Sequence, residues 1–91
     1  MSLSDSEVLD ALVEELAAIE HMRWAHWQAY VHEKGTRTPD GGLFLPPELI
    51  SRWDHQIATP YHALSEAEKD SDRDQVRRYL GIIRQALISG R

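Results

Sequence analysis

The sequence has 91 residues, a formal net charge of −5 and no cysteine. A chain of this length is expected to form one domain, residues 1–91, with a small core. The acidic balance argues against binding to the phosphate backbone of nucleic acids. No apolar run approaches the roughly 18 residues of a membrane span, and the polar residues 1–6 do not resemble a signal peptide. The absence of cysteine fits a reducing compartment, so we expect a soluble, cytoplasmic protein.

The first predicted helix runs from about residue 4 to residue 34. Ser4 and Glu7 have the spacing of a capping box at its start. Gly35 is expected to end it, with the cation of Lys34 in the last turn. Apolar residues recur at helical spacing between these ends, at Leu9, Leu12, Leu16, Ile19, Trp27 and Tyr30.

A loop and a short second helix are predicted next. Residues 35–46 form the loop, because Pro39 to Gly42 have the composition of a turn. The apolar run Leu43 to Leu45 could be extended or simply packed. The second helix covers about residues 47–58, because proline is accepted in a first turn and Pro60 disfavours helix at the residue before it. Its predicted inner stripe is Leu49, Ile50, Trp53 and Ile57.

The last predicted helix covers about residues 65–89. Ser65 and Glu68 form a second capping box, and Gly90 is a candidate cap at the other end. Gly81 lies inside the helix at a cost of about 1 kcal/mol relative to alanine. We therefore expect Gly81 to allow close approach of a neighbouring helix or subunit. The predicted apolar stripe is Val76, Leu80, Ile83 and Leu87.

These elements predict an all-α fold. The two long helices are expected to pack antiparallel, with the shorter middle helix against them and an irregular loop at residues 36–46. Leu12 and Leu16 would then meet the stripe of the last helix. Towards the other end the same seam becomes charged and aromatic, where Glu20, Arg23 and Trp27 would face Val76, Arg73 and Lys69.

The charged half of this seam is the candidate binding site. Buried charges must be paired, and Glu20, Arg23, Asp72 and Arg73 could pair among themselves. Aromatic walls with a few convergent charges are typical of small-molecule pockets. An ion network that only fixes helix register, with the tryptophans as core, is the structural alternative. The aromatic neighbours are Trp24, Trp27, Trp53 and Tyr61.

Two strings within this region resemble a known family. Residues 19–24, Ile-Glu-His-Met-Arg-Trp, are similar to the "EHxRW" signature of the ryanodine-receptor repeat domain. Residues 59–73 are similar to its second string, which runs from Pro-Tyr through Glu-x-Glu-Lys to Asp-Arg. The resemblance covers about residues 14–80. The family's Gly-Trp and Lys-x-x-x-Pro-x-Leu-Val portion has no clear counterpart, and residues 45–57 stand in its place.

The resemblance implies a pair of long helices and a binding role. Such domains are repeated in calcium-release channels. They also occur alone or fused in bacterial and phage proteins, where they are thought to bind nucleotide-like ligands. The positions that match the family's strings are Glu20, His21, Arg23, Trp24, Pro60, Tyr61, Leu64, Lys69, Asp72 and Arg73. Pro60 and Leu64 are expected to be structural.

Other chemistries have less support in the sequence. The five histidines form no i,i+4 pair and cysteine is absent, so no metal site is expected. No cofactor is expected either. No nucleophile elbow or phosphate loop is present, and no catalytic residue is assigned. An enzyme acting on the same ligand would use His21 or Glu20 as its base. Arg77, Arg84 and Arg91 recur every seven residues, which is more typical of a solvated face or subunit contact than of a nucleic-acid site.

Spare apolar residues predict a homo-oligomer. A small domain with apolar surface outside its main seams tends to self-associate, although some of these residues could instead cover the second helix. The residues are Val8, Val13, Met22, Ile82 and Ile88.

The sequence therefore predicts a non-enzymatic domain that binds a small, nucleotide-derived anion, without membrane or nucleic acid as a partner. Such a domain could sense or sequester a signal. A protein-interaction module with a purely structural seam and a ligand-cleaving enzyme are the alternatives. The predicted ligand-binding residues are Glu20, His21, Arg23, Trp24, Trp27, Trp53, Tyr61, Lys69, Asp72 and Arg73.

Overall fold

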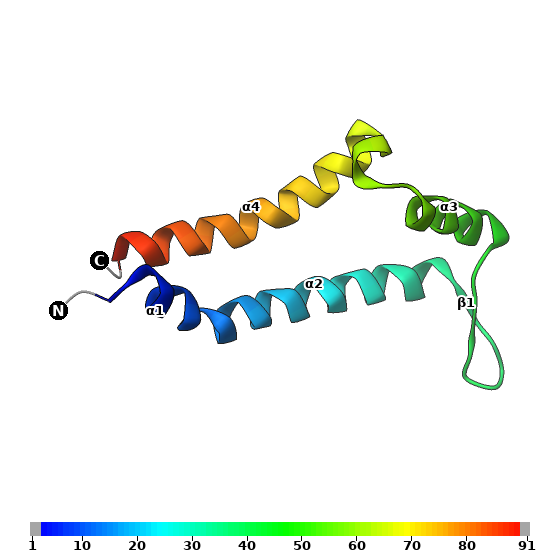
Figure 1. The fold of residues 1–91 in the computed structure, drawn as a ribbon. Helices are drawn as coiled ribbons and strands as arrows, with labels where there is room; N and C mark the ends of the chain where they lie inside the picture. The colour runs from blue at the N-terminus through cyan, green and yellow to red at the C-terminus, as the bar shows by residue number, and fades with distance from the viewer. Residues whose placement is uncertain (1–2, 90–91) are drawn as a thin grey trace. The chain divides into compact units, whose positions relative to one another are not determined.

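The computed structural model describes residues 3–89 and is mainly helical (Figure 1). Its elements are α1 (Asp5–Asp10), α2 (Val13–Lys34), β1 (Thr36–Arg37), β2 (Leu43–Phe44), α3 (Pro47–Ala58), the 3-10 turn η1 (Tyr61–Ala63) and α4 (Glu66–Ser89). The predicted fold class is confirmed. None of the helices in this described stretch has the length and apolar character needed to cross a membrane. Gly90, the candidate cap, lies outside the described residues.

The first long helix is interrupted, so the prediction of one continuous helix over residues 4–34 was wrong. The amide of Leu12 donates to the carbonyl of Leu9 at 3.0 Å, an i,i+3 bond that tightens the chain into a turn. Val8 and Leu12 are only 5% and 7% exposed. No proline or glycine occurs at this point. The break therefore accompanies the burial of Val8 and Leu12, and Val8 is a core residue rather than the spare surface that was predicted.

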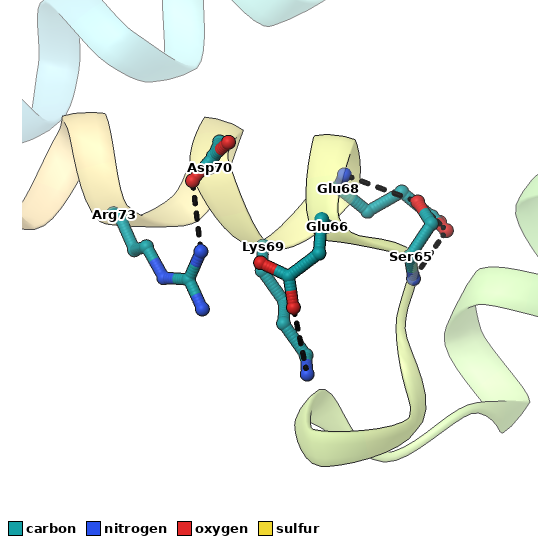
Figure 2. Close-up of polar contacts among 6 residues, drawn as sticks. All are labelled: Ser65, Glu66, Glu68, Lys69, Asp70 and Arg73. Atoms are coloured by element: carbon teal, nitrogen blue, oxygen red, sulfur yellow. Dashed lines mark hydrogen bonds and ion pairs between the residues drawn. The ribbon is translucent and has the colours of Figure 1, made fainter.

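Both predicted capping boxes are present. The Glu7 amide donates to the Ser4 hydroxyl and the Ser4 amide to the Glu7 carboxylate, each at 3.2 Å. Ser65 and Glu68 make the same reciprocal pair at the start of α4, also at 3.2 Å (Figure 2). These bonds satisfy amides that have no partner within the helix. Local side-chain chemistry thus sets where α1 and α4 begin.

The loop after α2 contains a two-stranded antiparallel hairpin, in which Thr36 pairs with Phe44. The carboxylate of Asp40 closes its turn by accepting bonds from the Thr38 hydroxyl and from the Gly42 amide. These two bonds hold the pKa of Asp40 below its ordinary value, with the Thr38 bond the larger cause. Gly41 has a φ of +89°, a conformation that side chains with a Cβ rarely adopt.

The chain divides into two compact units, and each is described by itself. The terminal unit is Met1–Met22 with Asp70–Arg91, and the central unit is Arg23–Lys69. In the terminal unit, α1 lies beside the C-terminal end of α4 (Figure 1). The Tyr79 hydroxyl donates to the Glu20 carboxylate and so joins α4 to α2.

Only part of the predicted stripe of α4 is covered. Ile83 and Leu87 are half-buried, whereas Val76 is 52% and Leu80 37% exposed. The helix meets α2 at Tyr79, which lies about 60° around the helix from Val76 at 100° per residue. This rotation leaves Val76 at the margin of the contact.

In the central unit, α3 also turns a different face inward from the predicted one. Leu49 and Trp53 are half-buried, but Ile57 is 82% exposed. The reason is the neighbouring Gln56, whose amide donates to the Glu68 carboxylate at the start of α4. The inner face therefore follows Leu49, Trp53 and Gln56, and the placement of Ile57 in the inner stripe was wrong.

Gly35, directly after α2, lies close against the second strand of the hairpin. A Cβ placed there would lie 2.6 Å from Cγ of Leu43 and 2.8 Å from the carbonyl oxygen of Phe44. We expect Gly35→Ala to lower the free energy of unfolding by about 1–3 kcal/mol, the usual cost of overpacking. Urea unfolding measures this change. A variant as stable as the parent would contradict the close approach of β2 to the end of α2.

Candidate functional site

The ten predicted site residues divide between the two units. Four of them lie in the terminal unit: Glu20, His21, Asp72 and Arg73. The other six lie in the central unit: Arg23, Trp24, Trp27, Trp53, Tyr61 and Lys69. Each group is described within its own unit.

Trp27, Tyr30 and Trp53 form an aromatic cluster in the central unit. The ring of Trp27 stacks on that of Tyr30, with centroids 5.4 Å apart and planes at 26°. Its centroid lies 5.6 Å from that of Trp53, with planes at 65°. Both are favourable geometries for aromatic pairs. The spacing of Trp27 and Tyr30 places them on one face of α2, and Trp53 reaches Trp27 from α3.

The aromatic cluster is accessible to solvent. Trp27 is 43% exposed, while Tyr30 and Trp53 are half-buried. Trp24, on the same helix, is 54% exposed. The alternative interpretation of Trp24 and Trp27 as plain core residues was therefore wrong. An indole held by two ring contacts and still open to water can stack on a flat ligand.

Two cations that were not predicted as site residues, Lys34 and Arg52, contact Tyr30 of the aromatic cluster. Nζ of Lys34 is 5.4 Å from the ring centroid of Tyr30. A guanidinium nitrogen of Arg52 lies 3.5 Å from the Tyr30 hydroxyl oxygen. The helical pattern predicted Tyr30 only as an apolar position and Lys34 only as a cation in the last turn of the helix. Their spacing from Trp27, three and seven residues along α2, is the signal that could have found them.

A second cation–aromatic contact joins two of the predicted residues. Nζ of Lys69 lies 5.8 Å from the ring centroid of Tyr61 and 3.6 Å from the Glu66 carboxylate (Figure 2). The Lys69 side chain is only 17% exposed, whereas that of Glu66 is 74% exposed. The structure thus brings Lys69 and Tyr61 together, as part of the start of α4 and the turn before it.

In the terminal unit, the predicted charges contact residues outside the predicted set. Arg73 bonds to the Asp70 carboxylate at 2.8 Å, an i,i+3 pair along α4 (Figure 2). Glu20 accepts a bond from Tyr79. Neither Asp70 nor Tyr79 was named as a site residue. Asp70 lies one helical turn from Arg73, a spacing that the sequence already displays.

Among residues 3–89, no group of three or more histidine, aspartate or glutamate side chains is placed to hold a metal ion. The ring and cation contacts of the central unit supply stacking surfaces and positive charge. No protein-family model, curated protein or solved structure matches the chain. The resemblance to the ryanodine-receptor repeat domain stays a prediction from the residues themselves.

Glu68 connects the start of α4 to α3. Its carboxylate accepts bonds from the Ser65 hydroxyl, the Gln56 amide and the Ser65 backbone amide, and these hold its pKa below the ordinary value. Because the folded state favours the charged form, the stabilisation is complete above the ordinary glutamate pKa. It is lost as the pH falls through the lower, folded-state pKa.

We expect Ser65→Ala to lower the stability at neutral pH by about 1 kcal/mol, as for other N-cap replacements. The difference from the parent should shrink in acid, where Glu68 is protonated in both proteins. Thermal or urea unfolding across the acidic range checks this. A difference that stays constant with pH would show that Ser65 does not act through the Glu68 carboxylate.

Proposed function

We propose that this chain is a non-enzymatic binding domain, and that the aromatic cluster holds a small, flat, anionic ligand of nucleotide type. The observation that supports this is the half-exposed indole of Trp27, which is fixed by Tyr30 and Trp53. Stacking on such a ring stabilises a bound base by about 1–3 kcal/mol. Lys34 and Arg52, at the same cluster, supply positive charge for a phosphate group.

The geometry favours binding over turnover. The aromatic cluster provides a stacking surface and cations, which are sufficient for recognition. Sensing and sequestering a signal nucleotide would both require only this. In the resemblance to the ryanodine-receptor repeat domain, the expected ligand is also nucleotide-like. If a bound nucleotide were converted to product, as chromatography of the mixture would reveal, the enzyme alternative would replace this proposal.

Calorimetric titration with a panel of linear and cyclic nucleotides tests the proposal. For a nucleotide that binds, Trp27→Ala should raise the Kd by about 5- to 150-fold, because it removes a stacking surface that contributes about 1–3 kcal/mol. Trp27→Phe keeps a ring and should lose less. Phe44→Ala is the control, since Phe44 is an exposed aromatic residue of β2, outside the aromatic cluster. The proposal would be overturned if Trp27→Ala bound the nucleotide with the same Kd as the parent protein and Phe44→Ala, or if no nucleotide bound at all.

The cations are tested separately from the ring. Lys34→Gln and Arg52→Gln should each weaken binding and reduce its dependence on salt, because each removes one charge from the phosphate contact. Both positions are on exposed helix surface, so the fold should persist in circular dichroism. An unchanged salt dependence in both variants would show that the anion is held elsewhere.

A further inference from the structure

The two ends of the chain carry opposite charge. Residues 1–22 hold six acidic side chains and no lysine or arginine, whereas residues 75–91 hold four arginines and no acidic residue. Both segments belong to the terminal unit. Oppositely charged helices in one unit can neutralise each other only where they face each other. The direction of the charged side chains therefore decides whether they are neutralised within one chain.

The contact between Tyr79 and Glu20 fixes the inner sides of α4 and α2. At 100° per residue, four residues of α4 from residue 75 onward lie about 140–180° around the helix from Tyr79, namely Arg77, Gly81, Arg84 and Ile88. We call these four residues the basic outer face. Glu14, Glu15, Ala18 and Met22 lie about 120–160° around α2 from Glu20 and form the acidic outer face. All eight residues are exposed.

The two outer faces point away from the contact that joins their helices, so they cannot cover each other within one chain. Each carries a large apolar side chain in water, Ile88 at 74% and Met22 at 69% exposure. Each also carries a small residue at its centre. A Cβ added at Gly81 would meet nothing within 4 Å, so no part of the described chain accounts for the glycine at this place.

We propose that the basic outer face docks on the acidic outer face of a second copy of this chain. With Ala18 opposite Gly81, the two helices can approach closely. When the two helices run antiparallel, Arg84, one turn after Gly81, lies within reach of Glu14 and Glu15 of the other copy, which come one turn before Ala18. Arg77, one turn before Gly81, then lies beside Met22 of the other copy and keeps its own exposed pair with Asp74, which contributes little to stability.

The contact is heterologous, because the two faces differ. Each copy keeps one face of each kind available for a further copy, so association leads to a closed ring or an open chain rather than to an isologous dimer. Opposite charge selects the partner: arginines beside a glycine on one face meet glutamates beside an alanine on the other. A nucleic acid would match only the basic face and would be repelled by the acidic one.

Light scattering coupled to size exclusion tests this at several protein concentrations and ionic strengths. We expect the mass to exceed that of the monomer at low salt and to fall as salt screens the charges. Arg84→Glu and the pair Glu14→Lys with Glu15→Lys should each weaken association at least tenfold. Mixing these two variants should restore it, because each reversed face then meets a complementary one. Arg78→Glu makes the same charge change about a quarter turn from the basic outer face and should have no such effect.

Gly81→Leu probes the close approach without changing charge. The added side chain has open space in the single chain, so helicity should be kept, but it should abolish association by steric exclusion. A parent protein that stays monomeric at low salt would overturn the proposal. So would charge-reversal variants that fold but fail to associate when mixed, or an unaffected Gly81→Leu. None of these outcomes depends on nucleotide binding, so the failure of one proposal leaves the other standing.

Discussion

The indole of Trp27 is the contact on which the central unit depends. It stacks on Tyr30 of its own helix and meets Trp53 of α3 edge-on, and so joins α2 to α3. Aromatic pairs of this kind stabilise by about 0.5–1.5 kcal/mol beyond the area that they bury. Among residues 3–89, Val8 and Leu12 are the only buried apolar residues, and both lie in the terminal unit. A thin core makes each of the few ring contacts more important.

Where the core is thin, hydrogen bonds between residues that are close in sequence determine the local structure. The capping boxes of Ser4 and Ser65 start two helices, and Asp40 closes the hairpin turn. These features were largely predictable, because each depends on residues within three or four positions of each other. The bounds of α3 and the start of α4 were predicted for the same reason.

Longer-range features were less predictable. The break before α2 has no proline or glycine to announce it, and it accompanies the burial of Val8 and Leu12. The exposure of Ile57 follows from the bond between Gln56 and Glu68, twelve residues apart, which an apolar periodicity cannot reveal. In the candidate site, Trp27, Trp53, Tyr61 and Lys69 were predicted and take part in ring contacts. Arg52 was missed, because its approach to Tyr30 requires α3 to lie against α2.

The proposed binding site and the proposed assembly surface lie on different units, which gives each its own chemistry. The aromatic cluster combines flat rings with cations, whereas the outer faces of the terminal unit combine opposite charges with small residues. Proton–nitrogen correlation spectra during a nucleotide titration test the central claim most directly. The account predicts that the indole signals of Trp27 and Trp53 and the amide signal of Tyr30 shift together and saturate. Shifts confined to the terminal unit, with both indole signals unmoved, would contradict it.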